Sequence, residues 1–386
     1  MRTYEKTHSW LQFSINLEKA PVAVWIMLGE CQSKCEHIAM VPLKPNVSKE
    51  LHQIYLAKGI AATTAIEGNS LSEEQARLLI EGKLKVPVSL EYQKNEIDNI
   101  LRCCNHILKK IKQRQPIVLS PNIIKYFNAE VLKNTIYDSD VMPGKVRKHS
   151  VGVAQYRGAP AEDCEYLLEK LCEWLNGEQF KAGRGMTIAT AILKAMIAHL
   201  YMAWIHPFGD GNGRTARLIE LLILINAGVP APAAQLLSNH YNNTRQEYYK
   251  QLADSSKTKD GGIAFIAYAV QGFLDGLKEQ LDRIWEQQWT IAWENLIHEV
   301  LPDKVSATQI RRRHLILDLS HKEKPVPLKE ITDASPRIAR EYAKKSRKTL
   351  IRDLNELIRL DLLELTPKGY RVRLETILQF LPTKLY

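Results

Sequence analysis

A short polar loop between two long apolar segments constrains this chain more than any other feature. The loop runs from His206 to Arg217 with the sequence HPFGDGNGRTAR, and the apolar segments are Thr187–Trp204 before it and Leu218–Ala227 after it. Two such segments around a turn rich in glycine predict buried helices. The sequence therefore predicts a mostly helical fold that carries this loop at the start of a core helix.

The start of the second helix has the features of an anion-binding site. Gly211, Asn212 and Gly213 permit unusual backbone angles where the first unpaired N–H groups of the helix point outward. The helix dipole adds positive charge there, and Arg214 and Arg217 lie three residues apart on the first turn. The loop therefore predicts a site that matches three or more phosphate charges.

Three other residues of the loop suggest what else the site does. Asp210 is a carboxylate among anion-binding groups, which is consistent with a divalent cation bridging it to phosphates. His206 is the only side chain of the loop that accepts a proton near neutral pH. Phe208 is an apolar anchor that turns the loop inward. The residues indicate a nucleotide or polyphosphate, a metal ion and a general base; a glycine-rich helix start with incidental arginines is the alternative.

The loop resembles the signature of the Fic family, His-x-Phe-x-(Asp or Glu)-Gly-Asn-Gly-Arg-x-x-Arg, and every specified position is filled. The resemblance implies a Fic-type helical bundle that transfers AMP from ATP to a Ser, Thr or Tyr hydroxyl of a target protein or of itself. It implies His206 as the catalytic base and Asp210 as the ligand of Mg²⁺ or Mn²⁺. The groups that would bind ATP phosphates are Gly211, Asn212, Gly213, Arg214 and Arg217.

Other functions on the same fold stay open at this point. Relatives that phosphorylate carry a lysine where this chain has Gly213, so the resemblance favours AMP transfer. A toxin-like enzyme that transfers another group, an enzyme that removes AMP, and a DNA-binding regulator whose Fic domain modifies its own chain are the alternatives.

A second motif lies upstream, at the end of a helix expected over Ser48–Ile66. Thr63, Glu67 and Gly68 match the motif (Ser or Thr)-x-x-x-Glu-(Gly or Asn), which resembles the inhibitory motif of the Fic family. The resemblance implies that Glu67 pairs with Arg217 and takes the cation that should bind the γ-phosphate. An ordinary solvated glutamate at a helix end is the alternative.

Two further segments gain an interpretation from the resemblance. The β-prone run around Val151, Gly152 and Val153 predicts a short hairpin, and family members carry a flap there that aligns the target segment by backbone hydrogen bonds. Tyr248 and Tyr249 lie in a segment that resembles the one closing the adenine pocket. Adjacent residues of a helix point apart, so we expect only one of them to contact the nucleoside.

Composition and cysteine spacing indicate the class of protein. The chain has 386 residues and a charged fraction of 25%, as in soluble globular proteins. The longest early apolar run, Ala20–Leu28, is too short to span a bilayer, and the six cysteines show no disulfide or zinc spacing. We therefore expect reduced thiols, a cytoplasmic protein and no membrane partner.

The C-terminal tail carries most of the excess charge. From residue 305 onward there are 18 Lys and Arg against 10 Asp and Glu, whereas the rest of the chain has 35 against 33. Helices expected over Ala307–Ser320, Ser335–Lys344 and Ser346–Arg359, followed by two short strands, resemble a winged helix. The residues expected to face DNA are Lys344, Lys345, Arg347, Lys348 and Arg352, with Lys368 on the wing. An acidic protein partner is the alternative.

Four regions follow from these patterns. Residues 1–114 form a helical region with the inhibitory motif, 115–255 the Fic catalytic core, 256–304 a helical linker and 305–386 a winged-helix domain. The linker carries Trp285, Trp289 and Trp293 on one stripe. This stripe predicts a seam between domains or between two copies in a homodimer.

Overall fold

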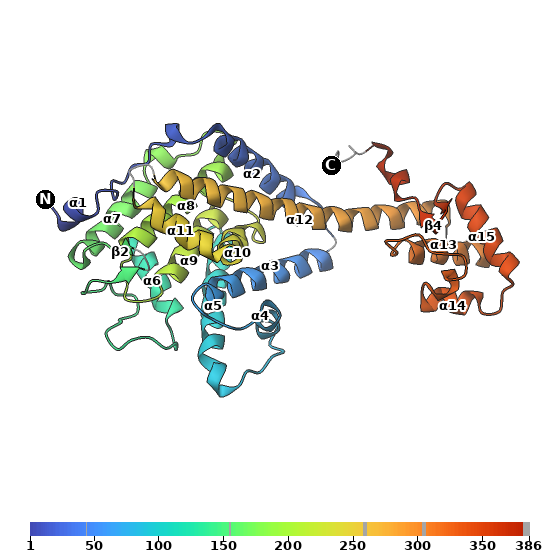
Figure 1. The fold of residues 1–386 in the computed structure, drawn as a ribbon, viewed down its shortest axis with the longest axis horizontal. Helices are drawn as coiled ribbons and strands as arrows, with labels where there is room; N and C mark the ends of the chain where they lie inside the picture. The colour runs from blue at the N-terminus through green and yellow to red at the C-terminus, as the bar shows by residue number, and fades with distance from the viewer. Residues whose placement is uncertain (44, 154–155, 258–260, 303–305, 381–386) are drawn as a thin grey trace. The chain divides into compact units, whose positions relative to one another are not determined.

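Apolar residues at helical spacing produce helices along most of the chain, and two antiparallel strand pairs are described (Figure 1). The structure is a computed structural model that describes residues 1–43, 45–153, 156–257, 261–302 and 306–380. It divides into unit 1, Met1–Leu281, and unit 2, Asp282–Tyr386, each with its own hydrophobic core. The division falls inside one long helix, within the segment that the sequence assigned to a linker.

Unit 1 consists of helices and one hairpin. Its helices are α1 (Thr3–Thr7), α2 (Val22–Met40), α3 (Pro45–Ala65), α4 (Glu73–Ile80), α5 (Glu91–Lys112), α6 (Pro121–Val131), α7 (Cys164–Leu175), α8 (Thr187–Ile205), α9 (Asn212–Asn226), α10 (Leu236–Asn243), α11 (Arg245–Ser255) and the first half of α12 (Gly261–Val300). The hairpin pairs β1 (Gly152–Val153) with β2 (Tyr156–Arg157) in the region predicted to form the flap.

The N-terminal region contains a long helix whose apolar stripe packs against the core. A 19-residue helix, α2, begins after Pro21 and buries Val24, Leu28, Cys31 and Cys35. These four positions repeat every three or four residues, so they form one apolar stripe against the core. Polar and apolar residues alternate irregularly on the other faces, which hid the stripe.

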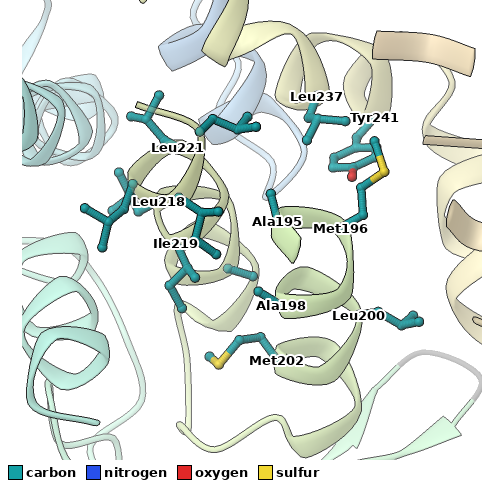
Figure 2. Close-up of a cluster of buried hydrophobic side chains, with 14 of the residues drawn as sticks. Ala195, Met196, Ala198, Leu200, Met202, Leu218, Ile219, Leu221, Leu237 and Tyr241 are labelled. Carbon is teal, nitrogen blue, oxygen red and sulfur yellow. The ribbon is translucent and has the colours of Figure 1, made fainter. Parts of the chain in front are cut away.

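The core of unit 1 is organised around α8 and α9. Figure 2 shows Ala195 and Ala198 on the side of α8 that faces α9, whereas Met196 extends toward Tyr241 of α10. Small residues on α8 let the two helices approach closely, as packing ridges of one into grooves of the other requires. Among the described residues, α8 is the one helix long and apolar enough to cross a membrane, and its burial in this core accounts for that composition.

The end of α3 and the start of α4 agree with the sequence signals. The main chain turns at Gly68, which adopts a φ of +100°, and α4 then begins at a capping box formed by Ser72 and Gln75. The Ser72 hydroxyl accepts from the Gln75 N–H at 3.2 Å, and the Gln75 side chain accepts from the Ser72 N–H at 2.9 Å. Residues 66–71 thereby form a fixed turn between the helices.

Unit 2 contains three helices and a strand pair besides the second half of α12. They are α13 (Ala307–Leu319), α14 (Pro336–Tyr342), α15 (Arg347–Arg359), β3 (Leu363–Thr366) and β4 (Gly369–Val372). An isolated bridge pairs Val326 with Tyr370, which adds a third extended segment beside β4. The order of these elements is the one that the sequence predicts.

The three tryptophans of α12 do not share one environment. Trp293 is buried in the core of unit 2, together with Ile297. Trp285 and Trp289 are 37% and 41% exposed. The predicted stripe is therefore partly a core face of unit 2 and partly a surface.

Candidate active site

The polar loop joins the end of α8 to the start of α9. His206 ends α8 in a left-handed conformation with a φ of 47°, and Gly211 precedes α9 with a φ of 76°. The Asn212 side chain closes the loop on Phe208, because it accepts from the Phe208 N–H at 3.0 Å and donates to the Phe208 carbonyl at 2.8 Å. Phe208 itself is buried, as an apolar anchor should be. The amide of Asn212 is thus used within the loop, and only its main-chain N–H remains for a phosphate.

A buried asparagine from α6 fixes the loop from outside. Asn128 donates to the Asp210 carbonyl at 2.9 Å, and its side-chain oxygen accepts from the Gly144 N–H at 2.9 Å. It is fully buried, so these bonds are shielded from water. The loop therefore has a defined shape before any ligand binds.

The two arginines of the loop present buried N–H donors without acceptors. Arg214 and Arg217 are both almost fully buried, although each carries a permanent charge. The Nε of Arg214 and the Nε and Nη1 of Arg217 have no hydrogen-bond partner among the described residues. Buried cationic donors are normally paired, so these donors indicate a place for an anion.

The carboxylate of Glu67 lies at that place. Its Oε1 is 2.5 Å from Arg217 Nη2, which also donates to the Thr63 carbonyl at 3.0 Å. A Cβ added to Gly213 would overlap Glu67 Oε1, so the carboxylate lies directly against the first turn of α9. Glu67 therefore occupies the anion site at this helix N-terminus.

The charges around Glu67 keep it ionised. Burial alone would raise the pKa of its carboxyl group, but the charge and hydrogen bond of Arg217, with Arg214 and His206, lower that pKa overall. Burial also tends to lower the pKa of Arg217, and Glu67, Tyr248 and Glu220 outweigh it, so that pKa is raised. The two groups remain a charged pair at neutral pH.

The imidazole of His206 is neutral at neutral pH. Burial and the charge of Arg147 lower its pKa to about 4, while Glu67 and a hydrogen bond to the Ala203 main chain act in the opposite direction. A neutral imidazole can accept a proton, which is what a general base requires. His206 therefore lies close to Glu67 and next to Gly158, which directly follows the hairpin that ends at Arg157.

Comparison with known proteins shows which family the domain around this loop belongs to. Residues 118–224 match the Fic/DOC family. The chain contains a Fic/DOC family domain. The Fic domain holds α6 to α9, and thus the whole polar loop, whereas Glu67 lies upstream of it.

Relatives and solved structures extend the likeness. The protein adenylyltransferase fic-1 of Caenorhabditis briggsae is 34% identical over 196 residues, which cover 49% of this chain and 34% of that protein. A solved structure of residues 134–508 of Fic-1 from C. elegans has a TM-score of 0.54 and 25% identity, over 69% of this chain and 74% of that one. A Fic family protein from Desulfovibrio desulfuricans shares the fold, with a TM-score of 0.57 and 19% identity over 91% of this chain and 95% of that one. This chain spans about a third of the length of the curated relative.

The other arginine of the loop is also paired with a carboxylate from outside the loop. Arg214 Nη1 lies 2.8 Å from Glu96 Oε1 of α5, and its Nη2 lies 3.3 Å from Asp210. The second oxygen of Glu96 accepts from the Asn69 amide at 2.8 Å. Asn69 directly follows Gly68 in the turn after α3. This turn therefore contacts Arg217 directly, through Glu67, and Arg214 indirectly, through Asn69 and Glu96.

Asp210 is placed as a single carboxylate at the rim of the site. Its side chain is 40% exposed and accepts from the Gly211 N–H at 2.5 Å. The described residues contain no group of three or more His, Cys, Asp or Glu side chains that could hold a metal ion by themselves. One accessible carboxylate fits Mg²⁺, which takes few protein ligands and shares the phosphates of a nucleotide.

The two tyrosines of α11 have different surroundings, as expected for neighbours on a helix. Tyr248 is buried, bonds to His199 Nε2 at 2.9 Å and stacks on Tyr241, so it belongs to the core. Tyr249 is exposed, and its hydroxyl donates to the Ile66 carbonyl at 3.2 Å. Tyr249 is therefore the member of the pair that is open to a ligand, and it already contacts the inhibitory segment.

Sequence reasoning missed three polar residues that hold the site: Asn128, Glu96 and Arg147. Asn128 interrupts the apolar stripe of α6 beside Phe127, and such a polar residue at a buried position is a usable signal. Arg147 precedes the hairpin and carried no signal beyond its charge. Glu96 lies on a helix rich in charged residues, so nothing distinguished it.

Proposed function

We propose that this chain is a protein adenylyltransferase held inactive by Glu67. The observation that carries the proposal is the Glu67 carboxylate bound to Arg217 on the first turn of α9, beside a neutral His206. The names of the curated relatives support AMP as the transferred group. ATP is then the nucleotide substrate, and a protein hydroxyl is the acceptor.

The residues support one order of events. His206 takes the proton of a Ser, Thr or Tyr hydroxyl, and that oxygen bonds to the α-phosphorus of ATP. The bond from the α-phosphorus to the oxygen that bridges to the β-phosphate breaks, and pyrophosphate leaves with that oxygen. The products are AMP-protein and pyrophosphate, and His206 later loses the proton to water.

The phosphates of ATP would take the place that Glu67 occupies. The N–H groups of Asn212 and Gly213 would bind phosphate oxygens, and that of Gly211 would do so after it releases the Asp210 carboxylate. Arg214 and Arg217 would supply their unpaired buried donors. Asp210 would hold Mg²⁺ or Mn²⁺, whose charge offsets that of the phosphates when the metal is bound. Since one site cannot hold two anions, ATP must displace Glu67 to bind productively.

The β1–β2 hairpin would present the acceptor segment. Val151 precedes the strand pair, and Gly152 pairs with Arg157. A short strand pair offers backbone groups to a target segment without reading its side chains. We therefore propose that a separate protein or a segment of this chain itself can be the acceptor, and that removal of AMP by water is a second activity of the same site.

Intact-protein mass tests the proposal. Glu67→Gly, incubated with ATP and Mg²⁺, is expected to gain one AMP or more, because ATP then reaches Arg217. Wild type is expected to gain at least about tenfold less, which corresponds to about 1.4 kcal/mol. Glu50→Gly places a glycine on the exposed face of the same helix and should behave like wild type. Addition of phosphate, or no addition to Glu67→Gly, would refute AMP transfer.

We also propose that unit 2 is a winged helix that binds DNA. Of the two acidic residues of α15, Asp353 is turned inward, where it pairs with Arg311 at 2.8 Å and Arg312 at 2.9 Å and accepts from Tyr342. The other, Glu356, pairs with Arg359 of the same helix at 2.7 Å. The basic residues predicted for DNA are turned outward and exposed, and none has an ion-pair partner in the described part of the chain. They are Lys344, Lys345, Arg347, Lys348, Arg352 and Lys368.

Salt-dependent binding tests that surface. Lys348→Ala/Arg352→Ala is expected to weaken binding of the full chain to a 30-base-pair duplex about tenfold and to lower the slope of log K against log salt by about 2. Lys322→Ala/Lys324→Ala removes two exposed lysines of the loop after α13 and is the control for net charge. Fluorescence anisotropy measures both. No binding by wild type would favour an acidic protein partner instead.

Two remaining expectations stay proposals. All six cysteines are free and buried, which supports a reducing compartment such as the cytoplasm, and localisation of a tagged chain tests it. Trp285 and Trp289 leave exposed aromatic surface on α12, which supports a homodimer, and native mass spectrometry tests that.

A further inference from the structure

A buried arginine outside the signature loop contacts the catalytic region from three sides. Arg147 is only 5% exposed, and among the described residues its guanidinium donates to main-chain carbonyls alone. Nε donates to His206 at 2.8 Å, Nη1 to His149 at 2.6 Å, and Nη2 to Ala159 and, at 3.4 Å, to Ile205. The Arg147 N–H also donates to the Pro207 carbonyl at 3.0 Å.

This arginine has no carboxylate partner in the described part of the chain. Burial lowers the pKa of its guanidinium, and Cys164 and Glu162 raise it only in part. Its charge faces the carbonyls of Ile205 and His206, which form the negative end of the α8 dipole. Burying an arginine on carbonyl groups alone is costly, so a structural role alone is a weak explanation for it.

The three segments that Arg147 joins are those that must meet during transfer. Two carbonyls belong to the end of α8, where His206 adopts its left-handed backbone. The others belong to His149, before the hairpin, and Ala159, after it. At Gly158, an added Cβ would lie 3.0 Å from His206 Cβ and 3.1 Å from Arg147 Nη2. The hairpin exit, the base and the guanidinium are therefore packed without spare room.

We propose that Arg147 is a positioning residue that fixes the position of the β1–β2 hairpin relative to His206. The base and the hydroxyl presented by the hairpin can then meet. The inference rests on the proposed transfer of AMP. Arg147 does not touch the phosphate site: every hydrogen bond described for it goes to a carbonyl of the α8 end or of the segments around the hairpin. It therefore acts through His206 and the hairpin and leaves nucleotide binding alone.

Electrostatics gives Arg147 a second effect on the same base. The charged groups that act on His206 are Arg147, before the hairpin, and Glu67, after α3. Arg147 lowers the pKa of His206 and Glu67 raises it. In a Glu67→Gly background the charge of Arg147 and burial still lower that pKa, so His206 stays neutral and the rate should be level from pH 6 to 8. Loss of the Arg147 charge should raise that pKa and move the acid limb of the rate profile upward.

The test compares Arg147→Lys and Arg147→Met in the Glu67→Gly background, with Arg184→Lys and Arg184→Met as matched controls. Arg184 lies exposed in the loop before α8. AMP incorporation is measured from pH 4.5 to 9, and binding of α,β-methylene-ATP is measured by calorimetry. Arg147→Lys should lower the rate about 10²-fold, as loss of alignment does, with the analogue bound within twofold of the parent. Arg147→Met should lower the rate similarly and move the acid limb upward in pH, whereas Arg147→Lys leaves the limb in place.

Other outcomes overturn the inference. A rate for Arg147→Lys within twofold of Arg184→Lys would show that the guanidinium positions nothing. Weaker analogue binding in proportion to the rate, or acid limbs that coincide in the Lys and Met variants, would leave only a structural role. If Arg147→Met does not fold, Arg147→Lys decides by its rate and binding, and failure of both to fold overturns the inference. A Glu67→Gly parent without AMP transfer would refute the proposed function as well.

Discussion

The Glu67→Gly/His206→Ala double variant is expected to bind ATP as Glu67→Gly does and to add AMP to protein about 10²- to 10⁴-fold more slowly. The buried imidazole, with its pKa lowered to about 4, is the group beside the anion site that can take a proton at neutral pH. Its removal leaves the loop intact, because Asn212 and Asn128 hold the loop through other atoms.

Two measurements separate catalysis from binding in that variant. AMP incorporation from labelled ATP gives the rate, and calorimetry with α,β-methylene-ATP gives the affinity. His321→Ala, an exposed histidine of unit 2, is the control in the same background and should keep the parent rate. A double variant that retains a rate within tenfold of Glu67→Gly would show that another group is the base.

Glu67→Gly is expected to melt at a lower temperature than wild type without nucleotide and to gain much more stability from it. The substitution leaves Arg217 buried without its anionic partner, at a cost on the order of 2 kcal/mol, below the usual value for a fully buried pair because Glu67 is 30% exposed. A nucleotide at a hundred times its dissociation constant adds about 2.7 kcal/mol.

Differential scanning fluorimetry with Mg²⁺ and α,β-methylene-ATP measures this exchange of anions. For a unit of this size each kcal/mol corresponds to a shift of about 2–4 °C, so the analogue should raise the melting temperature of Glu67→Gly by roughly 5–10 °C. Wild type should shift by much less, because Glu67 competes for the site. Equal shifts in both proteins would mean that Glu67 does not compete with the nucleotide.

The parts of the site that the sequence predicted are contiguous in the chain. Helix geometry places Arg214 near Arg217, and a helix start places N–H groups at Gly211 and Gly213, so the loop could be interpreted without a structure. Glu67 was found because its own short motif resembles one of the family. The pairing of Glu67 with Arg217, 150 positions apart, agrees with that interpretation.

The parts that the sequence did not predict depend on distant main-chain atoms. Arg147 binds carbonyl groups, which every residue possesses, so no side-chain pattern marks its partners. The Asn212 amide closes the loop on the main chain of Phe208, and the sequence did not indicate this bond. The sequence predicted a helical region over residues 1–114 but not the bounds of α2, because its buried stripe is narrow and its other faces are mixed.

In the proposed inhibited state, the Glu67 carboxylate and Arg217 belong to one chain, and this would determine how that state responds to concentration. The carbonyl of Ile66, next to Glu67, accepts from Arg245 and Tyr249 of α11, so the turn is tethered within a few ångströms of its binding place. After each opening the carboxylate returns in a first-order step. Within one protomer, dilution therefore does not activate the enzyme. The concentration of the nucleotide, and any ligand that shifts α11, set the fraction of time that the site stands open.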